Sequence, residues 1–119
     1  MKSYKDLIVW QKSLDLVELI YQITEELPSK EKFGLVSQMQ RASVSVPSNI
    51  AEGYGRQSSG SYAQFLSIAR GSLFELETQV ELCFRLKYIQ KIETEKIYTV
   101  ITEISKMLTA LISKIKTNA

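Results

Sequence analysis

The chain contains no histidine and only one cysteine, Cys83, among its 119 residues. A single cysteine excludes an intrachain disulfide, and without histidine a multi-ligand zinc site is not expected. The lack of histidine also removes the usual general base for a serine or cysteine nucleophile at neutral pH. Composition leaves room for a magnesium ion held by carboxylates, but no motif indicates one. We therefore expect no bound cofactor or metal.

Long apolar runs are also missing. No run approaches the ~20 residues that span a bilayer, and the opening MKSYKDLIVWQKSLDL carries charges where a signal peptide has an apolar stretch. We therefore expect a cytoplasmic protein without membrane contact. Two prolines and five glycines argue against disorder and against loop-rich β structure. The length fits one domain, which we assign to residues 1–119.

Charge is scarce in the middle of the chain. The net charge is only +2, which does not by itself indicate nucleic-acid binding, so the distribution of charge matters. Between Phe33 and Ala69 the only charged residues are Arg41, Glu52 and Arg56. Such a stretch would make a poor solvent-facing surface. We expect it to be buried, either within this chain or against a second copy.

Hydrophobic periodicity predicts helices at about residues 6–27, 33–54, 59–88 and 94–116. No segment shows the period-two alternation of a strand. Four helices with short connections favour an all-α, antiparallel up-and-down four-helix bundle.

Several residues set more detailed expectations for these helices. Trp10 and Tyr21 fall on an apolar ridge of the first helix and are predicted to lie in the core. Pro47 lies inside the second helix, where it removes a backbone hydrogen bond at a cost of ~3 kcal/mol, so we expect a kink or a break there. Ser61 and Gln64 have the spacing of a capping box for the third helix.

The run SVPSNIAEGYGRQSSGSYAQF, residues 45–65, resembles a phosphate-binding glycine loop at first sight. Its glycines, Gly53, Gly55 and Gly60, have the spacing G-x-G-x-x-x-x-G. This spacing matches neither the dinucleotide fingerprint nor the P-loop. A glycine that ends a helix commonly adopts the left-handed C′ conformation. We therefore predict a corner of the bundle.

A polar ridge runs along the second helix, because polar residues recur there every three or four positions. Its candidate contact residues are Gln38, Arg41, Asn49, Glu52 and Arg56. One interpretation is a structural network in which Glu52 pairs with Arg56 or with an arginine of another helix. The other is a contact with phosphate or with acidic groups of a partner.

The third helix carries a second ridge that is more apolar than a solvated face needs to be. This candidate oligomer interface consists of Ile68, Gly71, Glu75, Leu82 and Leu86. Glu81 and Arg85 are spaced for an ion pair on the same helix. Lys114 and Lys116, near the end of the last helix, suit the negative end of its dipole and are expected to be solvated.

Three runs carry a family resemblance: DLIVWQKSLDLVELIYQIT, FGLVSQMQRASVSVPSNIAEGYGR and FLSIARGSLFELETQ. In order and spacing they resemble the four-helix-bundle proteins encoded within intervening sequences of bacterial large-subunit (23S) ribosomal RNA genes. The most specific part is NIAEGYGR, and the last helix matches only in pattern.

That family is similar in fold to the accessory variability determinant of diversity-generating retroelements, a basic pentameric bundle that works with a reverse transcriptase and nucleic acid. The resemblance implies a homo-oligomer, with a pentameric ring as its form, and a role linked to RNA, DNA or a nucleic-acid enzyme. It implies no established activity. The chain departs from that basic protein by being nearly neutral, which argues against tight nucleic-acid binding.

Our leading hypothesis is a non-catalytic bundle that self-associates through its second and third helices and serves as a nucleic-acid-associated adaptor. A protein-interaction scaffold without nucleic-acid contact is the alternative. A third hypothesis, an enzyme using Glu52 and Glu75 as acid and base, lacks an accompanying nucleophile or metal set.

Overall fold

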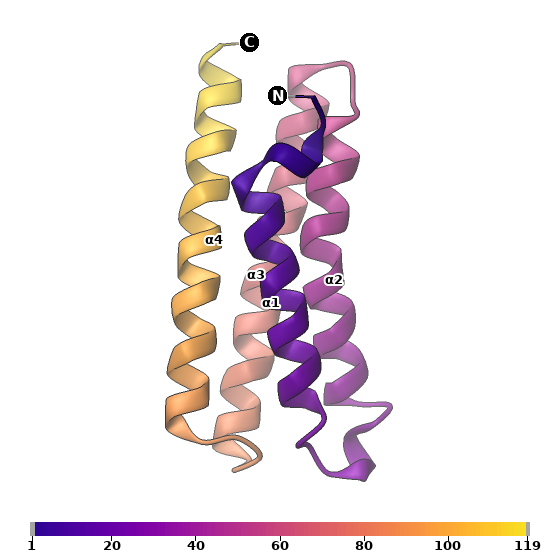
Figure 1. The fold of residues 1–119 in the computed structure, drawn as a ribbon, viewed down its shortest axis with the longest axis vertical. Helices are drawn as coiled ribbons and strands as arrows, with labels where there is room; N and C mark the ends of the chain where they lie inside the picture. Colours follow the sequence, from indigo (N-terminus) through magenta and orange to yellow (C-terminus); the bar gives the residue numbers. More distant parts are fainter. Residues whose placement is uncertain (1, 119) are drawn as a thin grey trace.

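The computed structural model describes residues 2–118, which contain helices and no strands. The long helices are α1 (Ile8–Thr24), α2 (Leu35–Tyr54), α3 (Ser59–Arg85) and α4 (Lys91–Thr117). Short 3-10 turns, η1 (Tyr4–Asp6) and η2 (Ser29–Glu31), precede α1 and α2. The helices run alternately up and down in an elongated body of 46 × 23 × 20 Å (Figure 1). The predicted antiparallel four-helix bundle is confirmed.

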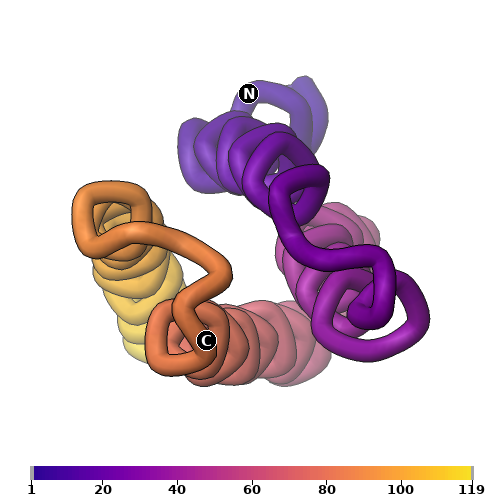
Figure 2. Tube along the Cα trace, turned by 90° about the horizontal axis from the view of Figure 1, so that it is seen from below, coloured from indigo at the N-terminus to yellow at the C-terminus, as the bar shows by residue number. Residues whose placement is uncertain are grey.

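The helices follow one another around the bundle axis in chain order (Figure 2). α2 and α3 form the largest helix–helix interface, and α1 and α4 form the smallest. The α2–α3 connection and both ends of the described chain lie at one end of the bundle, which we call the terminal end (Figure 1). The α1–α2 and α3–α4 connections lie at the other, which we call the distal end.

Each helix buries one apolar stripe in a common core. On α1 this stripe contains Val9, Leu16, Ile20 and Ile23. The neighbouring ridge lies at the edge of the core: Trp10 is half-buried and packs against it, whereas Tyr21 is 43% exposed, so the predicted core position was wrong for Tyr21. α1 has two adjacent apolar ridges, and only one of them can face the bundle axis.

α2 continues without a break through Pro47, which is itself buried. Of the two outcomes expected at this proline, the break into two helices does not occur. Val46 and Ile50, on either side of it, are fully buried. Their tertiary packing holds both halves of the helix in place although one backbone hydrogen bond is missing.

The corner between α2 and α3 uses glycine for close packing. A Cβ placed on Gly53 would lie 2.8 Å from the Cβ of Phe65, a separation that real Cβ atoms do not show. No described glycine has a positive φ, so the predicted left-handed conformation was wrong. Gly53 therefore allows α3 to approach the backbone of α2.

The helix ends differ from prediction by a few residues because the capping groups differ. Ser58, rather than Ser61, caps α3, because its Oγ accepts a hydrogen bond from the Ser61 backbone N–H at 3.1 Å. α4 starts earlier than expected, at Lys91, because Gln90 and Glu93 form a capping box that we did not predict.

Candidate interaction surfaces

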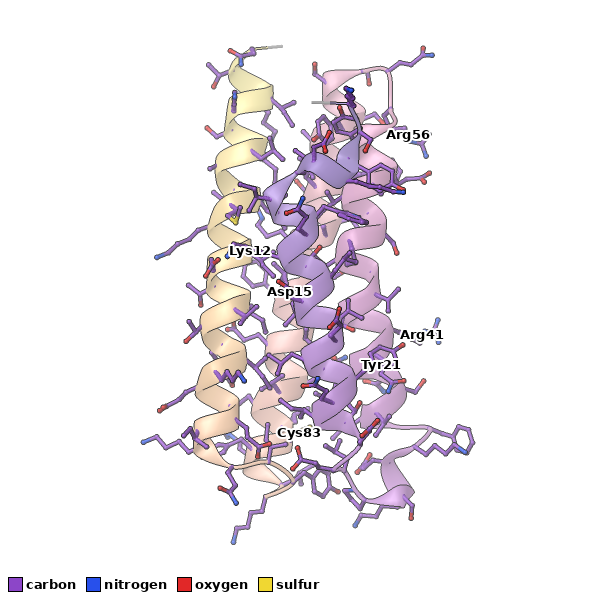
Figure 3. The ribbon with its side chains drawn as sticks, in the orientation of Figure 1. Lys12, Asp15, Tyr21, Arg41, Arg56 and Cys83 are labelled. Carbon is purple, nitrogen blue, oxygen red and sulfur yellow. The ribbon has the colours of Figure 1, made fainter. Side chains whose placement is uncertain are left out.

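The polar ridge of α2 lies on the outside of the bundle. Gln38, Arg41, Glu52 and Arg56 are exposed, and Asn49 is half-buried. Arg41 and Arg56 point away from the bundle, Arg56 near the terminal end and Arg41 closer to the middle of the long axis (Figure 3). The charge-poor stretch is therefore only partly buried within a single chain, and its burial against a second copy stays a prediction.

Glu52 and Arg56 form the ion pair that one interpretation of the ridge required. The distance from Arg56 Nη2 to Glu52 Oε1 is 2.6 Å, and both side chains are about half exposed. The guanidinium of Arg56 also lies 4.6 Å from the ring centre of Phe65 on α3. Arg56 is therefore positioned on two sides by its own chain.

The α3 ridge lies beside the α2 ridge, and the two form one surface. Ser45 of α2 and Ser72 of α3 are hydrogen-bonded through their Oγ atoms at 2.8 Å. Asn49 donates to the carbonyl oxygen of Ser45 at 2.8 Å and to its Oγ at 2.9 Å. We call this surface the α2–α3 face. It comprises Gln38, Arg41, Asn49, Glu52, Arg56, Ile68, Gly71, Glu75, Leu82 and Leu86.

Large apolar side chains are exposed on the α3 side of this face. Ile68 is 46%, Leu82 44% and Leu86 51% exposed. Gly71 has open space where a side chain would be. Three large apolar side chains of the predicted ridge are therefore exposed in a single chain, and their role as an oligomer interface stays a prediction.

Gln79 lies beneath the α2–α3 face and was missed by sequence analysis. It is seven residues from both Ser72 and Leu86 and therefore shares their side of α3. Its side chain is buried, and Oε1 has no hydrogen-bond partner among the described residues. A polar residue on an otherwise apolar stripe was the available signal.

A second surface is a groove between α1 and α2, which we call the α1–α2 groove. It encloses about 310 Å³ and is lined by Tyr4, Trp10, Leu14, Val17, Val44, Pro47, Ser48 and Ala51. The rings of Tyr4 and Trp10 meet edge to face at one end, with centroids 5.3 Å apart. The α1 ridge that was expected in the core therefore forms one wall of an open apolar groove.

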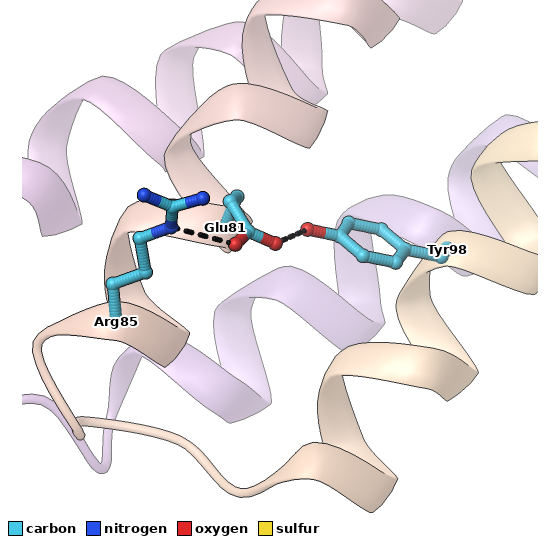
Figure 4. Close-up of polar contacts among 3 residues, drawn as sticks. All are labelled: Glu81, Arg85 and Tyr98. Atoms are coloured by element: carbon cyan, nitrogen blue, oxygen red, sulfur yellow. Dashed lines mark hydrogen bonds and ion pairs between the residues drawn. The ribbon is translucent and has the colours of Figure 1, made fainter.

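α3 and α4 are joined by a polar cluster on their outer side (Figure 4). Tyr98 donates a 2.6 Å hydrogen bond to Glu81 Oε1, and Arg85 Nε donates to Glu81 Oε2 at 2.9 Å. The bond from Tyr98, and then that from Arg85, lowers the pKa of Glu81. Burial, and then the bond to Glu81, raises the pKa of Tyr98. Neither group is therefore tuned to exchange a proton at neutral pH.

The carboxylates considered as an acid/base pair lie far apart. Glu52 lies at the level of Phe65 on α3, because the neighbouring Gly53 packs against Phe65. Glu75 is ten residues further along α3 than Phe65. That offset is about 15 Å along the helix. No group of three or more Asp, Glu or Cys side chains within residues 2–118 is arranged to hold a metal ion.

The sequence matches a family model described as 23S rRNA-intervening sequence protein over residues 5–110. The chain belongs to this family. A solved structure from Bacteroides thetaiotaomicron, described as a protein with unknown function from the S23 ribosomal protein family, is 32% identical and has a TM-score of 0.82. That match covers 88% of this chain and 98% of the other. No curated protein matches the chain.

The resemblance to this family inferred from the sequence is thus confirmed. In the most specific run of that resemblance, residues 49–54 form the end of α2, and Gly55 and Arg56 begin the connection to α3 at the terminal end of the bundle. No helix within the described part of the chain is long and apolar enough to cross a membrane. The five-subunit stoichiometry implied by the second resemblance stays a proposal.

Proposed function

We propose that this intervening-sequence protein is a non-catalytic subunit of a homo-oligomer that acts in the cytoplasm as an adaptor associated with nucleic acid. The observation that carries the proposal is the presence of two unlike apolar surfaces on opposite flanks of α2. One is the α1–α2 groove, and the other is the α3 side of the α2–α3 face.

A second copy of the chain is the occupant that fits both surfaces. A ridge of aliphatic side chains packs into a groove between helices, and Ile68, Leu82 and Leu86 are such a ridge. Val44 and Ala51 of α2 line the groove that would receive it. A contact between two different surfaces is heterologous, so each copy can bind the next in the same way. The copies form a closed ring when the rotation between successive subunits brings the last copy back to the first. Five subunits is the number that the family resemblance implies.

The polar groups of the α2–α3 face also fit a covered surface. Gln79 Oε1 is buried and has no hydrogen-bond partner within residues 2–118, which costs about 1–3 kcal/mol when no donor reaches it. Asn49 and Ser45 are half-buried and already hydrogen-bonded, so covering them requires little further desolvation. In this proposal Gln38, Arg41, Glu52 and Arg56 form the polar rim of the subunit contact.

The link to nucleic acid is supported by the family. Its description names an intervening sequence of 23S rRNA, and the similar Bacteroides structure is assigned to a ribosomal protein family. The non-catalytic assignment is supported by the polar cluster of Glu81 and Tyr98, whose pKa values are moved away from neutrality. It is also supported by the ion pair that occupies Glu52.

Light scattering on the purified protein tests self-association. We expect an oligomer at micromolar concentration for the wild type and a monomer for the double variant Leu82→Glu, Leu86→Glu, because the charges would be desolvated at the contact. The control is Phe33→Glu with Ile92→Glu, which changes two exposed apolar residues elsewhere and should leave the oligomer intact. A wild type that is only monomeric would refute the assembly.

Nucleic-acid association is tested separately, by binding of labelled RNA and DNA at several salt concentrations. Weaker binding at higher salt is expected, because phosphate contacts release counterions. Pull-downs before and after nuclease treatment distinguish the nucleic-acid adaptor from a protein scaffold without nucleic-acid contact. Partners that are held through nucleic acid are lost after digestion, whereas partners bound directly to the protein are kept. Absence of salt-sensitive binding, with captured proteins retained after nuclease, would favour the scaffold.

A further inference from the structure

We infer that the terminal end of the bundle is the surface that binds the phosphodiester backbone of RNA or DNA. This inference rests on the nucleic-acid association proposed above and specifies where it takes place. The supporting observation is a separation of charge along the bundle that the net charge of +2 conceals.

Ser45, Ser72 and Glu103 lie at or next to the midpoints of α2, α3 and α4, and Lys12, which pairs with Glu103, lies near the middle of the long axis (Figure 3). We use these positions to divide the bundle into two halves. The terminal half consists of residues 2–11, 46–71 and 104–118, and it contains seven Lys or Arg and two carboxylates. The distal half consists of residues 13–44 and 73–102, and it contains seven Lys or Arg and ten carboxylates. The halves therefore carry net charges of +5 and −3.

Both carboxylates of the terminal half are already engaged. Glu52 is paired with Arg56 at 2.6 Å. Asp6 accepts hydrogen bonds from the backbone N–H groups of Lys2 and Ser3, which lower its pKa, so it stays ionised but occupied. The remaining cations form no ion pair within the described residues. They are Lys2, Lys5, Arg70, Lys106, Lys114 and Lys116.

Neutral hydrogen-bonding groups lie between these cations. A cleft of about 270 Å³ is lined by Ser59, Gly60, Ala63, Gln64, Ser67 and Lys116. Further along, Arg70 Nη1 donates to Thr109 Oγ1 at 3.2 Å and is thereby oriented between α3 and α4. Lysine, arginine, serine, threonine and glutamine side chains are the usual partners of phosphate oxygens.

A nucleic-acid strand fits this surface better than an acidic protein does. Lys106 and Lys116 are ten residues apart on α4, or about 15 Å, a length that several successive phosphates span. Protein interfaces bury large apolar side chains at their centre. On α4 the exposed large apolar residue is Ile92, which is at the distal end, whereas the exposed large apolar residues of the terminal half, Ile8 and Ile68, are on α1 and α3.

The proposed ring would multiply this charge. Subunits arranged with parallel bundle axes would place their terminal ends on one face of the ring. A footprint of only a few cations per chain would thus be repeated around the assembly. Near-neutrality of the whole chain therefore does not argue against phosphate binding at one end.

The test is fluorescence anisotropy of labelled single-stranded RNA and DNA with the full chain over a range of salt concentrations. The variant Lys114→Gln, Lys116→Gln should weaken binding by about tenfold or more and reduce the slope of log K against log salt by about 1.5, if each lysine contacts one phosphate. The matched control, Lys30→Gln with Lys96→Gln, removes the same charge from the distal half and should change neither quantity.

The outcomes separate this inference from the proposed function. Wild-type protein that binds no nucleic acid would refute the association itself. Wild-type binding that both double variants weaken equally would refute only the assignment to the terminal end. Preference for polyglutamate over RNA would indicate an acidic protein partner instead.

Because Lys114 and Lys116 also stabilise the end of α4, Arg70→Gln provides a second test, with thermal melting confirming that each variant folds.

Discussion

Tyr98 on α4 donates a 2.6 Å hydrogen bond to Glu81 on α3, and this contact ties together two helices that are otherwise joined mainly by apolar packing. Glu81 also pairs with Arg85, as the sequence predicted from their spacing. Spacing along the chain did not predict that Tyr98 joins the same cluster, because the tyrosine comes from another helix.

Replacement of Tyr98 by phenylalanine should destabilise the fold in a pH-dependent way. The pKa of Glu81 in the folded protein is lowered from 4.5, so the hydrogen bonds to its carboxylate stabilise the fold above pH 4.5. This stabilisation is lost as the pH falls through the folded pKa. The pKa of Tyr98 is raised from 10.0, so its contribution is present below pH 10 and is lost above it. Urea unfolding should therefore show a difference between the two proteins at pH 6–9 that shrinks toward pH 3. A difference independent of pH would contradict this account.

Gly53→Ala should destabilise the bundle by about 1–3 kcal/mol, because the new Cβ would clash with Phe65 and Tyr62. Gly71→Ala is the matched control. Gly71 lies within α3 and faces open space, so alanine should stabilise the helix there by up to about 1 kcal/mol. Denaturant unfolding of both variants at low protein concentration measures the two effects. Equal effects of the two substitutions would refute the close-packing explanation.

Lys87→Gly should stabilise the protein by about 0.5–1 kcal/mol. Lys87 has φ 66, the left-handed conformation that favours glycine. It follows α3 in a Schellman motif, in which Tyr88 N–H donates to the Cys83 carbonyl at 2.8 Å and Lys87 N–H donates to the Phe84 carbonyl at 3.0 Å. Lys87→Ala removes the same charge without relieving the backbone, so only glycine should raise the melting temperature.

Glu26→Gln should stabilise the distal end at neutral pH. The hydrogen bond and charge repulsion between the Glu26 and Glu93 carboxyl groups raise the pKa of Glu26 above 4.5. Because the pKa of Glu26 is raised in the folded protein, its protonated carboxyl stabilises the fold below pH 4.5. This stabilisation is lost as the pH rises through the pKa of Glu26 in the folded protein. The variant should therefore melt at a higher temperature than wild type at pH 7 and lose that advantage near pH 4. Glu25→Gln, one residue away, is the control for charge alone.

Cys83 should not react with a thiol reagent until the protein unfolds. Its side chain is buried, and its Sγ lies 3.4 Å from the Sδ of Met39. Burial, and then the charge of Glu31, raises the pKa of the thiol to about 11, so little thiolate forms at neutral pH. Absorbance-monitored labelling with and without denaturant measures this. Rapid labelling of the native protein would show that the α2–α3 core opens readily.

The candidate surfaces were only partly predictable. The ridges of α2 and α3 follow from helical spacing within each segment, and both are exposed as ridges in the structure. That they lie side by side was not predictable, because the Ser45–Ser72 contact joins residues 27 positions apart. The α1–α2 groove was missed, because Trp10 and Tyr21 belong to a ridge that spacing alone could not distinguish from the buried one.

The sequence by itself determined where the four helices lie, because helical periodicity and turn residues act over only a few positions. Four helices with short connections then predicted the bundle, and specific runs such as NIAEGYGR indicated the family. The tertiary structure decided which ridge of α1 is buried and why Gly53 is needed, since both depend on which helix packs against which. It also decided the charge separation. The chain gives a net charge of +2 in any arrangement, but antiparallel folding brings Lys5, Arg70 and Lys116 to one half of the bundle and most carboxylates to the other.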